Sequence, residues 1–145
     1  APIMDGVVSL MQKMKRDGLQ IGIVTGSGQR PLIERVLTDF RHFVNRRHIV
    51  TAYDVKCGKP APDPYLMGLQ KAGNFRPNEG IVVENAPLGV RAGVAAGIFT
   101  VAVNTGPLSQ SALKKEGADL VFDSMPAWCD AWDDFYFSIK KQTDC

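Results

Sequence analysis

Short apolar segments alternate with amphipathic segments along most of this chain, and this alternation restricts its fold more than any other feature. The apolar segments are six residues or shorter and rich in β-branched side chains, as buried strands are. They occupy residues 20–25, 49–51, 80–83, 99–103 and 119–122. Strands that alternate with helices predict an α/β fold, here a Rossmann-like three-layer sandwich with a mostly parallel sheet.

The amphipathic segments predict the helices that cover this sheet. Their apolar residues recur every three or four positions, and Gly or Pro stands at many of their ends. We expect helices over residues 4–17, 31–40, 64–72, 87–96, 109–115 and 126–140. In the last of these, Trp128, Trp132, Phe135 and Tyr136 form an aromatic stripe that we expect to pack in the core.

The composition excludes several classes of protein. The chain has 145 residues, which corresponds to one domain over 1–145. Lys and Arg number 17 against 15 Asp and Glu, so a formal charge of +2 gives no reason to expect nucleic acid or an anionic membrane as a partner. No apolar run approaches the roughly 20 residues of a membrane helix, and residues 1–20 lack the apolar core of a signal peptide.

Cysteine usage points to a reducing compartment. The three cysteines, Cys57, Cys129 and Cys145, are too few and too odd in number for a disulfide framework. We therefore expect a cytosolic protein. We also expect Cys57 to be a small packed side chain rather than a nucleophile.

Polar residues follow the first predicted strand, at the edge of a parallel sheet where ligands gather. Thr25, Gly26 and Ser27 offer two hydroxyl groups and free backbone N–H groups next to the start of a helix. Such a turn can hold an anion, because glycine allows close approach. The alternative is that these residues only cap the helix.

The segment Gly58-Lys59-Pro60-Ala61-Pro62-Asp63-Pro64 is too rich in proline for regular structure. Its prolines fix the backbone around Lys59, whose ammonium could neutralise a phosphate or a nucleophilic carboxylate. The alternative is an ordinary solvated lysine. Because the loop must turn sharply, we also predict a cis peptide bond between Lys59 and Pro60.

A carboxylate and an amide end the apolar strand over residues 80–83. The oxygens of Glu84 and Asn85 are ligands that suit Mg²⁺. The alternative is that the two residues cap the helix that begins near Pro87.

These three groups, in this order, resemble the motifs of the haloacid dehalogenase superfamily, especially its β-phosphoglucomutase-like and phosphoglycolate phosphatase-like branch. Thr25 in Ile23-Val24-Thr25-Gly26-Ser27 resembles the second motif, Lys59 the third, and Glu84-Asn85 the fourth, within a similarity that covers about residues 2–125. The resemblance implies Mg²⁺-dependent phosphoryl transfer from a small phosphorylated metabolite, by a phosphatase or a sugar-phosphate mutase. It assigns phosphate binding to Thr25, Gly26, Ser27 and Lys59, a substrate-facing position to Gln29, and the metal to Glu84 and Asn85.

Two departures from the family pattern matter. The first motif, a strand ending in Asp-x-Asp, has no counterpart, and Asp5 follows no apolar strand. Asn85 stands where the branch usually has a second carboxylate. The resemblance therefore implies a C-terminal portion of a longer enzyme, with Ala1 a cut point, without a cap domain and inactive alone. The missing strand would lie between those ending at Thr25 and Glu84, so another chain or an N-terminal segment would have to complete the sheet.

Two other functions compete with this one. The chain could be a non-catalytic α/β module that binds phosphate or a partner protein. A dinucleotide-binding fold is disfavoured, because no Gly-x-Gly-x-x-Gly follows the first predicted strand.

Overall fold

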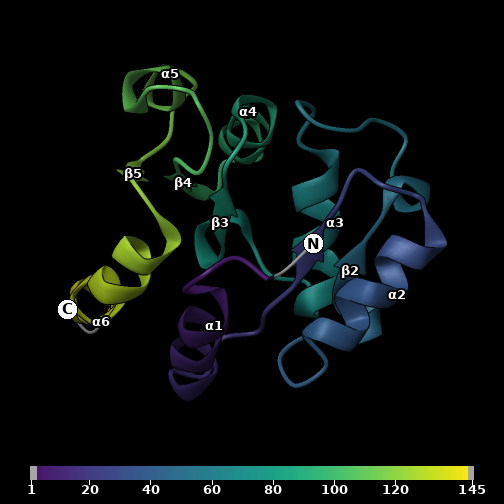
Figure 1. Ribbon diagram of the computed structural model, residues 1–145, viewed down its shortest axis with the longest axis horizontal. Helices are drawn as coiled ribbons and strands as arrows, with labels where there is room; N and C mark the ends of the chain where they lie inside the picture. Colours follow the sequence, from purple (N-terminus) through teal and green to yellow (C-terminus); the bar gives the residue numbers. More distant parts are fainter. Residues whose placement is uncertain (1–2, 144–145) are drawn as a thin grey trace.

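A computed structural model describes residues 3–143 of the chain, so the expectations for Ala1 and Cys145 concern residues outside the described part. Helices and strands alternate as predicted (Figure 1). The helices are α1 (Val7–Arg16), α2 (Arg30–Asp39), α3 (Asp63–Gly73), α4 (Pro87–Ala95), α5 (Gln110–Lys115) and α6 (Met125–Thr143). The strands are β1 (Ile23–Val24), β2 (Ile49–Val50), β3 (Ile81–Glu84), β4 (Phe99–Val103) and β5 (Leu120–Phe122).

The strands are parallel, but in the described chain they form two sheets rather than one. One sheet has the order β1-β2, with Val24 opposite Val50. The other has the order β3-β4-β5, with Glu84 opposite Ala102. The division falls between β1 and β3, where the resemblance puts the strand that this chain lacks. The strand predicted over residues 20–25 is shorter in the structure: β1 has only two residues, because residues 20–22 form no strand pairs with β2.

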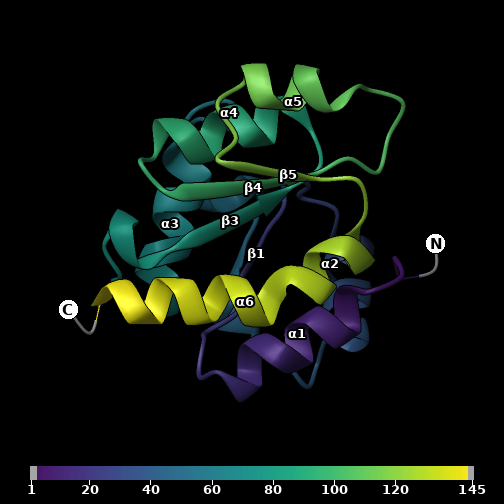
Figure 2. The ribbon, with the colours of Figure 1, turned by 90° about the vertical axis from the view of Figure 1, so that its left-hand side faces the viewer.

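Helices cover both faces of the three-stranded sheet, which confirms the predicted α/β architecture. Figure 2 shows α4 and α5 on one face and α6, with α1 beyond it, on the other. Helix α3 packs against β1 and β2, and it also contacts α4. Val24 of β1 packs beside Val82 of β3 in one apolar cluster, so the two sheets share a core although their strands do not pair.

The aromatic stripe of α6 lies in the core, as predicted. Trp128 and Trp132 are fully buried and pack against Leu10 of α1 and Val101 of β4. Burial of such large rings is among the strongest contributions to folding. The stripe therefore joins the sheet, α6 and α1 into one unit.

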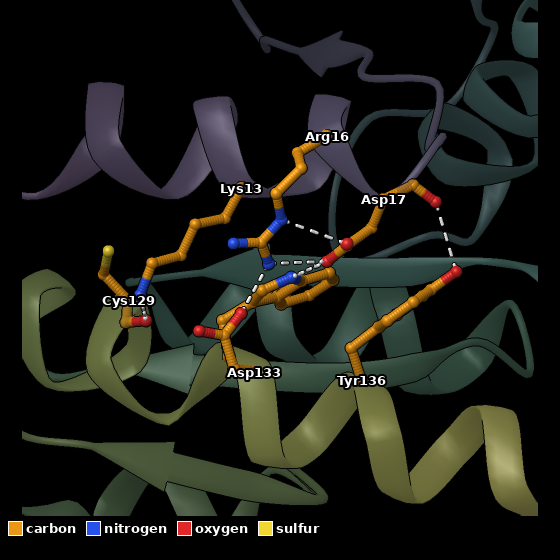
Figure 3. A network of polar contacts seen from close by, with 7 residues as sticks. Lys13, Arg16, Asp17, Cys129, Asp133 and Tyr136 are labelled. Carbon is orange, nitrogen blue, oxygen red and sulfur yellow. Dashed lines mark hydrogen bonds and ion pairs between the residues drawn. The ribbon is translucent and has the colours of Figure 1, made fainter.

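Polar contacts add to this joint between the first and last helices (Figure 3). Asp17, at the end of α1, accepts hydrogen bonds from Trp132 Nε1 at 2.7 Å and, through its carbonyl, from the Tyr136 hydroxyl at 3.1 Å. Lys13 Nζ donates to the Cys129 carbonyl at 2.8 Å. The Arg16 guanidinium, and then the Trp132 N–H, lower the pKa of the Asp17 carboxyl. We call these contacts the α1–α6 clasp.

Cys57 is exposed, so the prediction of a packed side chain is wrong. Its neighbours Lys56 and Gly58 are exposed as well, so the loop runs over the surface there. No helix in residues 3–143 combines the length and the apolar character that crossing a membrane requires.

Candidate active site

The turn after β1 is organised by its own hydroxyl groups. Thr25 N–H extends the β1–β2 pairing by donating to the Val50 carbonyl at 2.9 Å. Thr25 Oγ1 accepts the Ser27 N–H at 3.1 Å, and Ser27 Oγ accepts the Gln29 N–H at 3.0 Å. Each hydroxyl uses only an acceptor lone pair in these bonds, so each keeps a proton to donate to an anion. Helix α2 receives no side-chain cap bond from its N-cap residue, Gln29.

The proline-rich loop places Lys59 between the ends of the two sheets. Its Lys59–Pro60 peptide bond is cis, which confirms the prediction. Lys59 Nζ donates to the Val24 carbonyl at 3.4 Å, at the end of β1, and forms an ion pair with Glu84 at the end of β3. The side chain is 22% exposed, so Lys59 is not the ordinary solvated lysine of the alternative interpretation.

Two of the three sequence groups open onto one cavity. It measures about 290 Å³, and its lining includes Thr25, Gly26 and Lys59 together with residues 52–58 in part and Pro64. The space around Gly26 is open enough that a Cβ there would touch nothing within 4 Å. Hydroxyl, backbone N–H and ammonium donors around a small cavity are the groups that bind an oxyanion.

Ser27 and Gln29 are not among the residues that line this cavity. A 3-10 helix over Ala52–Asp54 contributes residues both to this cavity and to a larger surface cavity of about 400 Å³. That second cavity has mixed charge, with Lys71 paired to Asp54 at 3.0 Å. The structure thus brings Thr25, Gly26 and Lys59 together and leaves Ser27 and Gln29 out of the lining.

Glu84 is the most enclosed polar group of the site. Its Oε1 accepts hydrogen bonds from Lys59 Nζ and from the Tyr65 hydroxyl, while Oε2 accepts the Asn85 N–H at 3.2 Å. The carboxylate lies directly on α4, because a Cβ added at Gly89 would come within 2.2 Å of both of its oxygens. Only glycine at position 89 leaves room for it.

The donor set fits part of a magnesium site. Asn85 Nδ2 donates to Thr105 Oγ1 at 3.1 Å, which leaves Asn85 Oδ1 and Glu84 Oε2 as the oxygens that a cation would take. Within residues 3–143, no three His, Cys, Asp or Glu side chains gather as a metal site. Mg²⁺ takes six oxygen ligands, so these two residues could hold it only with further ligands from elsewhere. In the described chain α4 has Ala86 as its N-cap with no side-chain cap bond, so Glu84 and Asn85 do not cap it.

Sequence reasoning missed Tyr65, which contacts both Lys59 and Glu84. Its ring centroid lies 5.1 Å from Lys59 Nζ, and its hydroxyl donates to Glu84. Burial first, and then the Glu84 charge, raise the pKa of the tyrosine well above its usual range. The sequence did contain a signal for Tyr65: it stands in the first turn of the helix that follows the Lys59 loop, and a buried tyrosine hydroxyl needs a polar partner.

The amino-acid sequence as a whole is related to known proteins, in agreement with the order of the motifs and the shared cavity. The pattern that defines the haloacid dehalogenase-like hydrolases matches residues 2–103. The chain belongs to this family. Hexitol phosphatase A of Escherichia coli is 39% identical over 120 residues, which cover 83% of this chain and 53% of that protein. Validoxylamine A 7'-phosphate phosphatase of Streptomyces hygroscopicus is 36% identical over 105 residues, or 72% of this chain and 48% of that protein.

The fold is shared with solved structures of the same family. A Bacteroides vulgatus protein, provisionally described as a beta-phosphoglucomutase, superposes with a TM-score of 0.84 at 51% identity. The match covers 92% of this chain and 54% of that one. This haloacid dehalogenase-like chain thus spans about half the length of each of these three relatives.

Proposed function

We propose that this chain carries the phosphate-binding part of a phosphatase or sugar-phosphate mutase that acts on a small phosphorylated metabolite. The observation that supports this most is the convergence of Thr25, Gly26 and Lys59 on one cavity. Two relatives are named as phosphatases, one of hexitol phosphates and one of validoxylamine A 7'-phosphate, and these names support the class of substrate we propose.

In this proposal each residue has a distinct task. The Lys59 ammonium offsets charge on the phosphoryl group and on the group that attacks it. Thr25 Oγ1 and the N–H groups of the turn hold non-bridging phosphate oxygens. Ser27 and Gln29, outside the lining of the cavity, face the remainder of the substrate.

The nucleophile is proposed to come from outside the chain. An aspartate carboxylate at the end of a strand between β1 and β3 would bond to phosphorus as the substrate alkoxide leaves with a proton. Lys59 already joins the ends of those two strands, so such a carboxylate would arrive beside its ammonium. The chain alone would therefore bind phosphate and not turn substrate over.

Glu84 and Asn85 would supply two of the oxygens around Mg²⁺, and the remaining ligands would come from the absent strand and the phosphate. When bound, the cation neutralises charge on the transferring group. The cysteine content supports a cytosolic setting for this chemistry.

The test uses the chain extended at its N-terminus by an apolar strand ending in Asp-x-Asp. With Mg²⁺, we expect this version to hydrolyse a phosphomonoester from a panel of hexitol, glycerol and sugar phosphates, and the unextended chain to be inactive. Lys59→Ala should abolish turnover, by about 10³-fold or more, while Lys71→Ala, a lysine of similar burial outside the cavity, should not.

If the extended version hydrolyses no phosphomonoester, the enzyme proposal is wrong, and the alternative of a non-catalytic phosphate- or protein-binding module takes its place. Unchanged turnover in Lys59→Ala would remove Lys59 from the mechanism. Binding of inorganic phosphate to the unextended chain, measured by titration calorimetry, separates a phosphate-binding module from one that binds a protein.

A further inference from the structure

We propose that Tyr65 is a positioning residue that holds the Glu84 carboxylate and the Lys59 ammonium in the arrangement seen here. Its importance for catalysis rests on the function proposed above, whereas the positioning itself is a property of the unextended chain. Tyr65 is not part of any motif that the sequence analysis singled out.

Tyr65 contacts both charged groups through different parts of its side chain. The hydroxyl donates to the same oxygen, Glu84 Oε1, that accepts the Lys59 ammonium. The ring lies under the ammonium, with Nζ 5.1 Å from its centroid, a distance at which a cation is attracted to an aromatic face. The three side chains therefore form a closed triangle of contacts, which we call the Lys59–Glu84–Tyr65 triangle.

The tyrosine is the rigid member of this triangle. It is 9% exposed and packs with Val82, Ala92, Ala96 and Ile98 in the core between β3 and α4. Its backbone is fixed in the first turn of α3, where its N–H donates to the Pro62 carbonyl at 3.1 Å. A lysine has a flexible four-carbon stem, so its ammonium is placed accurately only when such neighbours restrict it.

The carboxylate has little freedom of its own once the hydroxyl is in place. Gly89 closes one side, and the Asn85 N–H occupies Oε2. Glu84 Oε1 has two donors, Lys59 and Tyr65, so without the Tyr65 hydroxyl only the flexible lysine would hold it.

The experiment measures how fast an acylating reagent modifies Lys59 in the folded, unextended chain, by peptide mass spectrometry. Lys71 serves as the internal reference, because it is 27% exposed and ion-paired, against 22% for Lys59. We expect Tyr65→Phe to speed acylation of Lys59 about fivefold, since one buried hydrogen bond is lost, and to leave Lys71 unchanged. Tyr65→Leu, which also removes the ring, should speed it further.

Glu84→Gln is the matched variant for the ion pair, and it should release Lys59 at least as much as Tyr65→Phe. If Glu84→Gln accelerates acylation and Tyr65→Phe does not, Tyr65 is no positioning residue and the proposal is wrong. If neither variant changes the rate, the triangle does not restrain Lys59 and the proposal is equally wrong. Tyr65→Phe keeps the ring and its packing, so it remains decisive if Tyr65→Leu does not fold.

The same variants in the active, extended version show whether positioning serves catalysis. There we expect Tyr65→Phe to lower kcat about tenfold with KM nearly unchanged. If the extended wild-type version shows no turnover, the proposed function is contradicted, but the acylation result still stands. The two proposals can therefore fail separately.

Discussion

The two sheets of this chain differ in the helices that cover them and in what they carry. β1 and β2 have two residues each, and both residues of β2 are buried, but α2 beside them has no buried residue. In the other sheet four of the five residues of β4 are buried, and two tryptophans cover it. The region of β1, β2 and α2 supplies Thr25, the loop after it supplies Lys59, and the region of β3 and α4 supplies Glu84 and the surroundings of Tyr65. The candidate site thus lies at the boundary between these two regions.

The largest expected effect on stability comes from a substitution in the core between β4 and α6. Trp132→Ala removes a fully buried ring and its hydrogen bond to Asp17, and should lower the free energy of unfolding by about 3–5 kcal/mol. Val36→Ala, in the partly buried face of α2, should lower it by about 1 kcal/mol. Urea denaturation followed by circular dichroism measures both.

Equal losses from Trp132→Ala and Val36→Ala would mean that the two regions contribute alike to stability, contrary to the comparison. Amide hydrogen exchange gives an independent measure. We expect β4 to exchange much more slowly than β1 and β2.

A middle-sized effect is expected at the boundary between the regions. Gly89→Ala places a Cβ within 2.2 Å of the Glu84 carboxylate oxygens, so the carboxylate must move. We expect a net loss of about 1–2 kcal/mol despite the better helix propensity of alanine, together with faster acylation of Lys59. Gly26→Ala is the control, since a Cβ there meets open space. A Gly89→Ala variant as stable as the wild type, with unchanged Lys59 reactivity, would show that the carboxylate is not confined.

The smallest effect concerns the charge in the α1–α6 clasp. The pKa of Asp17 is lower in the folded chain, so its contribution to stability is complete above the ordinary carboxyl pKa of about 4 and is lost as the pH falls through the lowered value. Asp17→Asn should therefore flatten the acid limb of the stability curve below about pH 5. Asp133→Asn, at a more exposed carboxylate of the same network, serves as the control variant. Identical acid limbs in Asp17→Asn and wild type, from urea titrations at several pH values, would contradict this.

Local sequence signals were sufficient for most of the fold. Gly18 and Gly97 follow helices that end near the predicted positions, because glycine accepts the left-handed backbone found there. Helix α3 ends at Gly73, as predicted, and the left-handed residue that caps it is Asn74. The aromatic stripe of α6 predicted its own burial. The first strand was predicted too long, since pairing partners, and not β propensity, decide where a ladder begins.

The candidate site was predictable only in part. Proximity in an α/β fold could be inferred for Thr25 and Lys59, because both follow strands or loops at the carboxyl edge of the sheet. The burial of Tyr65 against Glu84 depends on how α3 packs against β1, β2 and α4, which no local pattern encodes. Whether Glu84 and Asn85 hold Mg²⁺ stays a prediction.

The α1–α6 clasp also has a consequence for the order of folding. Its hydrogen bonds join residues 115 to 119 positions apart, so they cannot form until α6 has left the ribosome. Contacts of such long sequence separation slow folding, because a long loop must close before they contribute. Leu10 of α1 therefore stays without its α6 partners Trp128 and Trp132 while the segments between them are made, and that exposed apolar face favours aggregation until α6 docks.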